Sequence, residues 1–221
     1  MLKPNIVKVA VKAIPEPVLR RLPVYYQYLR KLNLEAPKEY ISCARIAEDL
    51  NTLAIQVRKD MAITGAQGRP KVGYKVAELI KAIEIFLGWN NTSEAYLVGA
   101  GNLGSALLGY QGFKDYGLNI IAAFDASPDK IGSEIYGKKV LSVKKLPEMI
   151  KRMGIKIGIL TASASCAQEL TEIMVNAGIK AIWNFAPVKI SVPEGIIVQH
   201  ENLASSLAVL SKRLALLLAE R

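Results

Sequence analysis

The sequence has little of the chemistry used for metal binding, disulfide bonds or histidine catalysis. Its 221 residues include only 2 cysteines and 1 histidine. Cys43 and Cys166 lie far apart with no metal-ligand spacing, so we expect two reduced thiols and no bound metal. His200 stands alone, and a lone histidine is more often structural than catalytic. No Gly-x-Ser-x-Gly nucleophile motif occurs.

Long uncharged apolar runs are also missing. Lys3, Lys8 and Lys12 interrupt the first residues, which excludes the apolar core of a signal peptide. No uncharged apolar stretch reaches the roughly 20 residues that span a membrane. The sequence has no internal repeat and no low-complexity tract. We therefore expect a soluble, cytoplasmic protein without a membrane partner.

Positive charge is in excess. Lys and Arg number 29 against 19 Asp and Glu, which gives a net charge of +10. Up to residue 90 there are 15 basic and 8 acidic residues, so the excess lies mostly in the first part of the chain. Such a balance favours an anionic partner, most simply nucleic acid.

A glycine-rich stretch at residues 96–106 has the pattern of an apolar strand, a tight turn and a helix. Gly99, Gly101 and Gly104 have the spacing of a dinucleotide-binding turn. Gly99 would permit the turn, Gly101 would let the backbone approach a pyrophosphate, and Gly104 would let the helix pack closely on the strand. The helix start offers free N–H groups to phosphates. The predicted cofactor contacts of this turn are Gly99, Ala100, Gly101, Asn102, Leu103 and Gly104.

Asp125 strengthens this interpretation. It ends a second apolar run, residues 120–124, at about the 20-residue distance where a ribose-binding acid belongs. The alternative is a turn residue before Ser127 and Pro128. The glycines and the acid together predict bound NADH or NAD⁺. The carboxylate should repel a 2′-phosphate, so NADH should bind better than NADPH.

The first part of the chain is predicted to be helical. Residues 1–13 alternate Lys with Val and Ile, which fits a short strand or a basic arm. One helix is expected from Pro15 to about Asn33, and another from Ala44 to Leu50 with Ser42 as its N-cap. A third should span residues 53–63. In that helix Val57 and Met61 share one face, and the remaining surface is assigned to Gln56, Arg58, Lys59 and Asp60.

Two short helices joined by a small turn, the second with basic and amide side chains, are typical of a helix-turn-helix. Residues 65–74 then combine glycines with Arg69 and Lys71, which indicates a β-hairpin wing along a phosphate backbone or in a minor groove. The alternative is a solvated basic loop. A further helix is predicted at residues 76–87. The predicted DNA contacts are Gln56 (a possible base reader), Arg58, Lys59, Arg69, Lys71 and Tyr74.

Beyond residue 90 strands and helices alternate. Strands are expected at residues 95–98, 119–124, 139–142, 155–160, 179–184 and 196–199, with helices near 103–112, 144–152 and 165–177. Such alternation predicts a mostly parallel sheet with helices on both faces. Ligands lie at the carboxyl ends of such strands. Beyond the turn and Asp125, the expected cofactor contacts there are Thr161, Ala162, Asn184 and Phe185.

A final helix is predicted from Asn202 to Glu220. Leu203, Leu207, Leu210, Leu214 and Leu217 recur every three or four residues. This stripe would either cover the protein's own sheet or form a seam with another helix. The basic head and the nucleotide fold account for nearly all of the chain, which leaves no room for a substrate domain. We therefore expect a protein that senses its cofactor and is not an enzyme that consumes it.

Several segments together resemble the family of redox-sensing transcriptional repressors called Rex. The similar segments are 14–16, 21–26, 56–60, 73–74, 99–104 with Tyr110, and 184–187. The resemblance implies a winged helix-turn-helix domain (residues 1–89), a Rossmann-like NAD(H)-binding domain (90–200) and a C-terminal helix (201–221) swapped between subunits of a homodimer. It also implies binding to palindromic operator DNA, release by NADH and weak competition by NAD⁺.

The sequence departs from the family pattern in three places. Gln27 stands where the first helix usually has an arginine that joins a subunit-spanning network with the tyrosine matching Tyr110. The wing reads Gly68-Arg69-Pro70-Lys71, and Ile63-Thr64 replaces an aromatic pair. We expect Tyr110 and Gln27 to couple the two domains without a charged latch.

Two other functions stay open from the residues themselves. One is a small NAD-dependent oxidoreductase with a basic appendage. The other is a coenzyme A-binding protein, since such domains share the glycine turn. Asp125 speaks against this function, because an acid at that position suits a free ribose 2′-OH.

Overall fold

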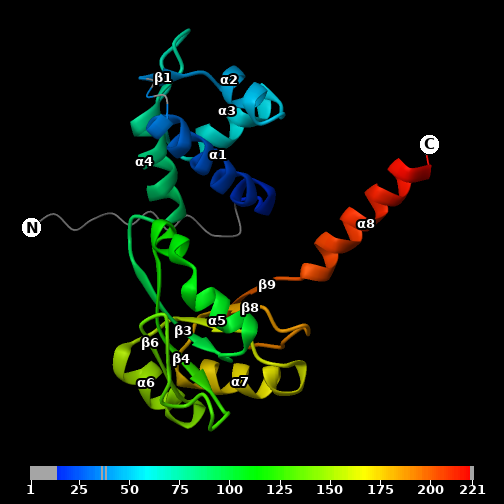
Figure 1. The fold of residues 1–221 in the computed structure, drawn as a ribbon. Helices are drawn as coiled ribbons and strands as arrows, with labels where there is room; N and C mark the ends of the chain where they lie inside the picture. The colour runs from blue at the N-terminus through cyan, green and yellow to red at the C-terminus, as the bar shows by residue number, and fades with distance from the viewer. Residues whose placement is uncertain (1–13, 36, 38, 220–221) are drawn as a thin grey trace, which may run out of the picture. The chain divides into compact units, whose positions relative to one another are not determined.

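The computed structural model describes residues 14–35, 37 and 39–219, and Figure 1 traces them along the chain. The chain divides into two compact units, residues 1–91 and 92–221. The strand or arm expected at residues 1–13 lies outside the described residues. Each unit is described here by itself.

The described part of the N-terminal unit contains four helices and a small sheet. The helices are α1 (Glu16–Glu35), α2 (Cys43–Asp49), α3 (Ala54–Ile63) and α4 (Val76–Leu87). Ser42 caps α2 as predicted, because its Oγ accepts a hydrogen bond from the Arg45 amide at 3.1 Å. The helices bury a common apolar core that includes Leu22, Leu29, Ile46, Val57, Met61, Leu79 and Ile83.

A two-stranded sheet completes this unit. β1 (Tyr40–Ile41) pairs antiparallel with β2 (Tyr74–Lys75). The predicted hairpin before β2 is a tight turn in which Arg69 and Gly73 exchange backbone hydrogen bonds of 2.7 and 2.9 Å. Gly73 has φ +105°, and a Cβ there would lie 2.2 Å from the Ile41 carbonyl oxygen. Only glycine therefore fits where the turn joins the sheet.

The C-terminal unit contains a seven-stranded sheet in the order β5-β6-β4-β3-β7-β8-β9. Six strands are parallel and match those predicted: β3 (Ser93–Val98), β4 (Leu118–Asp125), β6 (Lys138–Ser142), β7 (Ile157–Leu160), β8 (Ala181–Asn184) and β9 (Ile197–His200). Two elements were not predicted: β5 (Glu134–Ile135), which pairs antiparallel with β6, and the 3-10 helix η2 (Gln111–Tyr116).

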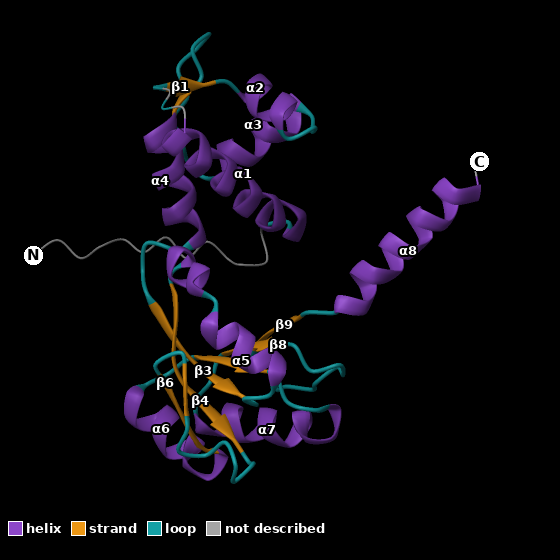
Figure 2. Ribbon diagram, in the orientation of Figure 1, coloured by secondary structure: helices purple, strands orange, loops and turns teal. Residues whose placement is uncertain are grey.

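Helices cover both faces of this sheet, as Figure 2 shows. β3 alternates strictly: Tyr96 and Val98 pack on the side of α6 (Leu146–Met153) and α7 (Ala164–Ala177), whereas Ala95 and Leu97 face α5 (Asn102–Gly109). Both faces of the central strand are buried, which explains its continuous apolar run.

The last described element is α8 (Leu203–Ala219). Leu207, Leu210, Leu214 and Leu217 of the predicted stripe are all exposed. The stripe therefore does not cover the protein's own sheet, which was one of the two expectations. No helix in the described part of the chain is long and apolar enough to cross a membrane.

Candidate functional site

The sheet order fixes where a ligand would sit. Numbered in chain order, the parallel strands lie in the order third, second, first, fourth, fifth, sixth, so the strand order reverses between β3 and β7. Open parallel sheets bind ligands outside the carboxyl ends of the strands at this switch point. β3 ends at Val98 and β7 ends at Leu160, so Gly99 and Thr161 face each other at the site.

The three glycines of the turn differ in their surroundings. Gly99 has φ +106°, and a Cβ there would lie 2.8 Å from the Ala162 nitrogen. A Cβ on Gly104 would lie 2.1 Å from the Gly99 carbonyl oxygen, because α5 starts directly against the end of β3. A Cβ on Gly101 would meet nothing within 4 Å. The first and third glycines serve the protein's own packing, and the second borders open space.

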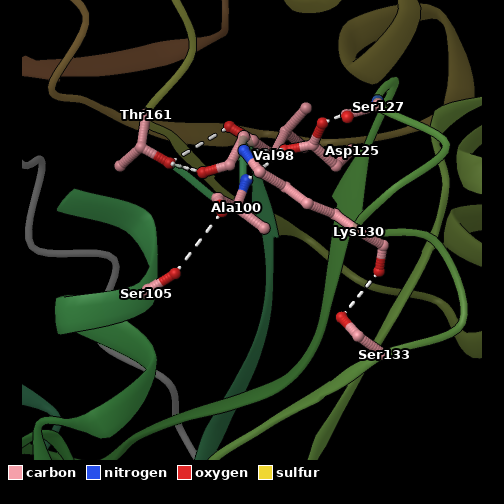
Figure 3. Close-up of polar contacts among 9 residues, drawn as sticks. Val98, Ala100, Ser105, Asp125, Ser127, Lys130, Ser133 and Thr161 are labelled. Carbon is pink, nitrogen blue, oxygen red and sulfur yellow. Dashed lines mark hydrogen bonds and ion pairs between the residues drawn. The ribbon is translucent and has the colours of Figure 1, made fainter. Parts of the chain in front are cut away.

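Thr161 ties the two sides of the switch point together. Its Oγ1 donates to the Val98 and Gly99 carbonyl oxygens at 3.2 and 2.6 Å. Ser105 in α5 contacts the Ala100 carbonyl oxygen at 3.4 Å. These bonds, drawn in Figure 3, hold the turn in place before any ligand arrives.

Asp125 closes the turn from the end of β4. Its carboxylate accepts hydrogen bonds of 2.8 Å from the Ala100 and Ser127 amides, and Lys130 Nζ lies 3.4 Å from Oδ2 (Figure 3). Burial alone would raise the pKa of Asp125, but the two amide hydrogen bonds and the Lys130 charge outweigh it and hold that pKa below its ordinary value. The carboxylate is thus an anion with lone pairs left for further donors. Sequence reasoning did not foresee Lys130.

A cavity of about 240 Å³ lies over the switch point. Its lining includes Gly99, Gly101, Asp125, Thr161 and Ala162, which all belong to the predicted cofactor site. Ala100 is buried behind the turn, whereas Asn102 and Leu103 at the start of α5 are exposed. The lining also includes Lys130, Cys166 and several apolar side chains.

The other predicted contacts lie at the end of β8. Asn184 is fully buried, and its Nδ2 contacts the Val188 carbonyl oxygen and His200 Nδ1 at 2.8 and 2.9 Å. Phe185 borders a second cavity, of about 610 Å³, together with His200. His200 therefore has a structural partner, in keeping with the expectation for a lone histidine.

A row of aromatic rings runs from Phe185 to Tyr110, the residue that ends α5. Ring centroids are 4.8 Å apart from Phe185 to Trp183, 5.6 Å from Trp183 to Phe113, and 4.8 Å from Phe113 to Tyr110. Trp183 Nε1 also donates to Glu201 at 3.0 Å, just before α8. Tyr110 itself is 52% exposed. Gln27, its predicted counterpart, is exposed on α1 in the other unit.

Asp60 corrects the assignment of the α3 surface. Its side chain is completely buried and accepts four hydrogen bonds: from Arg21 Nε and Nη2 at 2.7 and 2.9 Å, from Tyr25 Oη at 2.9 Å and from Gln56 Nε2 at 2.9 Å. The placement of Asp60 on the surface was wrong because helical spacing cannot reveal a partner on α1. The amide of Gln56, the expected base reader, is held by this carboxylate.

The remaining predicted DNA contacts gather around α3 and the turn. Arg58 and Lys59 are exposed on α3, and Lys71 is exposed at the turn with φ +62°. The Arg69 guanidinium lies over the Tyr40 ring, 5.1 Å from its centroid. The ring of Tyr74 packs against Gly68. No group of three or more His, Cys, Asp or Glu among the described residues is arranged to hold a metal ion.

Known proteins match both units of the chain. Residues 13–62 match the family model "Putative DNA-binding protein N-terminus", and residues 90–188 match the CoA binding domain. The redox-sensing transcriptional repressor Rex of Treponema denticola is 52% identical over 195 residues, 88% of this chain and 92% of the relative. The chain belongs to the Rex family. Rex of Bacteroides fragilis is 41% identical over 201 residues, 91% of each chain.

Solved structures of a Rex-family repressor named RSP are similar to this chain over most of its length. RSP in complex with β-NAD⁺ and operator DNA has a TM-score of 0.86 at 36% identity, with 91% of this chain and 92% of RSP covered. RSP in complex with β-NADH has a TM-score of 0.82 at 36% identity, with 91% and 94% covered. The winged-helix and Rossmann-like fold predicted from the sequence is therefore confirmed, and the relatives are repressors rather than enzymes.

Proposed function

We propose that this Rex-family protein is a cytoplasmic, homodimeric repressor that binds operator DNA and releases it when NADH binds. The observation that carries the proposal is the switch-point turn: Gly101 borders open space, and the Asp125 anion closes the turn behind it. This combination suits a pyrophosphate on the helix start and a ribose on the acid. The binding of operator DNA, NAD⁺ and NADH by the relative RSP supports it.

The adenosine half of the cofactor would occupy the cavity at the switch point. In this proposal Asp125 accepts hydrogen bonds from the ribose hydroxyls, and the turn residues 99–104 hold the pyrophosphate. Thr161 and Ala162 form the opposite wall. The nicotinamide would reach the second cavity, beside Asn184 and Phe185. The reduced ring is uncharged and apolar, so the apolar side chains of this cavity, Phe185, Ala186 and Val188, favour NADH over NAD⁺.

DNA would bind to the N-terminal unit. Exposed Arg58 and Lys59 lie on one helix, and Arg69, Lys71 and Tyr74 belong to the adjacent turn and strand. Cations arranged around a helix-turn-helix suit phosphates and guanine edges. Phosphate contacts release counterions, so affinity should fall steeply with salt, and Lys71→Ala should flatten that dependence by roughly one unit of slope. An Arg69→Ala, Lys71→Ala double variant with unchanged affinity and slope would remove the turn from the interface.

Dimerisation would use α8. Its exposed leucines recur at coiled-coil spacing, and such an apolar stripe is costly to leave in water. We expect a dimer by light scattering, and a shift to monomer in a Leu210→Glu, Leu214→Glu double variant. A Lys212→Glu variant places the same charge on an exposed position between them and should stay dimeric. A monomeric wild type would refute the seam.

Coupling would run through the aromatic row. Closure around the nicotinamide would move Phe185, Trp183 and Phe113 in turn, and Tyr110 would pass the change to the DNA-binding heads near Gln27. The two N-terminal units would then rotate, so that their recognition helices no longer fit half-sites separated by whole turns of DNA. Because Gln27 provides no charged latch, we expect the coupling free energy between NADH binding and DNA binding to lie at the low end of roughly 1–3 kcal/mol. NADH should then weaken DNA binding about ten-fold.

One titration separates the candidate functions. The purified protein is titrated with NADH, NAD⁺, NADPH and coenzyme A, with and without a duplex selected by the protein from a random pool. We expect NADH to bind best, and duplex and NADH to weaken each other by the same factor, as linkage demands. Equal binding of NADH and NADPH would rule out the role of Asp125. NADH affinity that the duplex leaves unchanged would refute redox sensing, and coenzyme A as the tightest ligand would favour the coenzyme A alternative.

A further inference from the structure

The exposed face of α3 begins with an aliphatic side chain. The helix buries Val57, Asp60 and Met61 against the rest of the unit. The opposite face is Ile55, Arg58, Lys59 and Ala62, all exposed and spaced at i, i+3, i+4 and i+7 along one side of the helix. Ile55 is 55% exposed, although a large apolar side chain gains nothing from water.

The expected reader of bases does not lie on this face. Gln56 is half-buried, and its amide donates to Asp60 Oδ1 at 2.9 Å. Asp60 is itself fixed by Arg21 and Tyr25. At the N-terminal turn of the helix, the first exposed side chain on this face is therefore Ile55.

Recognition helices approach base edges with their N-terminal residues. In the major groove the only apolar group on a base edge is the C5-methyl of thymine. Arg58 and Lys59, one turn further on the same face, supply the cations that suit phosphates and guanine acceptors. An aliphatic group flanked by cations thus has the complementarity of a thymine-containing major groove.

We infer that Ile55 reads a thymine in each operator half-site by packing against its C5-methyl group. This inference rests on the proposed DNA binding and adds a base preference that the cations cannot supply. Removing one methyl from the contact should weaken binding by about four-fold, the effect of exposing one buried apolar carbon. Removing it from both half-sites should weaken binding by about fifteen-fold.

Deoxyuridine provides the test, because it differs from thymidine only by that methyl group. A duplex selected by the full-length protein from a random pool is resynthesised with each thymine pair of the palindrome replaced by deoxyuridine, and affinities are measured at one salt concentration. One pair should stand out for the wild type. Ile55→Ala should lose affinity for the thymine duplex and lose its sensitivity at that pair, whereas Ile55→Val should keep the sensitivity.

Ile63→Ala is the matched control. Ile63 is the same residue type on the same helix, 39% exposed, at the opposite end. This variant should keep the full response to deoxyuridine. Equal affinity of the wild type for all substituted duplexes, or an unchanged response in Ile55→Ala, would overturn the inference while the repressor function stood. Failure to select any duplex would overturn both.

Discussion

Asp60 should be among the most sensitive positions of the N-terminal unit, and the change Asp60→Asn tests this. The carboxylate is fully buried and accepts four hydrogen bonds from three side chains: two from Arg21, and one each from Tyr25 and Gln56. Asparagine has nearly the same shape. It replaces one acceptor oxygen by a donor that faces other donors, and it removes the charge opposite Arg21.

The expected loss follows from the burial of the two partners. Removing one member of a buried ion pair lowers the free energy of unfolding by about 3–5 kcal/mol, because the other charge is left buried without a partner. The Arg21 side chain is 31% exposed and regains some hydration, so we expect the low end, about 3 kcal/mol. That is a large share of the roughly 5–15 kcal/mol by which domains are stable.

Urea unfolding of the full-length chain provides the measurement. Trp89 lies in the N-terminal unit and Trp183 in the other, so a Trp183→Phe background makes fluorescence report the N-terminal unit. Glu78→Gln is the control, because Glu78 forms an exposed pair with Lys75 at 3.5 Å and should cost less than about 1 kcal/mol. A similar small loss for Asp60→Asn would refute the argument.

The same carboxylate should make this unit sensitive to acid. Burial alone would raise the pKa of Asp60, but the hydrogen bonds from Arg21, Gln56 and Tyr25 and the charge of Arg21 hold that pKa below its ordinary value. The stabilisation is therefore complete above the unfolded pKa, about 4, and is lost as the pH falls through the lower folded pKa. The urea midpoint should drop over this range in the wild type and drop less in Asp60→Asn.

Three glycine substitutions make contrasting predictions. Gly101→Ala should fold normally, because its Cβ meets nothing within 4 Å, yet lose NADH binding in a titration because the pyrophosphate could not approach. Gly104→Ala should instead destabilise the sheet unit in thermal unfolding, since its Cβ would lie 2.1 Å from the Gly99 carbonyl oxygen; a normal melting temperature would contradict this. Gly73→Ala should weaken DNA binding and leave NADH binding intact, because it strains the turn beside Ile41, and unchanged DNA affinity would argue against the turn as a contact.

Local signals in the sequence predicted most of the fold. Ser42 and Gly88 mark helix ends through capping and a left-handed φ, and α4 has the bounds predicted for it. Apolar runs that alternate with helical segments along the chain predicted the parallel strands. The antiparallel β5 was missed because two residues carry no readable period.

Only the part of the candidate cofactor site that a sequence motif encodes could be predicted. The glycine spacing identified the switch point because a Cβ on Gly99 or Gly104 would clash with nearby backbone, whereas Gly101 borders open space. Arg21 and Tyr25, the partners of Asp60 on α1, could not be found that way, since these contacts depend on how two helices pack. Lys130 follows Asp125 by only five residues, but no motif assigns a lysine at that distance to the acid. The assignment of Gln56 as a base reader rested on residue type alone, and a partner four residues along the same helix engages its amide.

The position of the switch-point cavity between β3 and β7 has a consequence for protein synthesis. A ribosome completes the N-terminal unit, with its own core, when residue 91 has been made. The cavity also needs Thr161, about 70 residues later, which takes roughly 4 to 14 seconds at ordinary elongation rates. During that interval a nascent chain contains every residue of α3 but not yet the residues that complete the cavity.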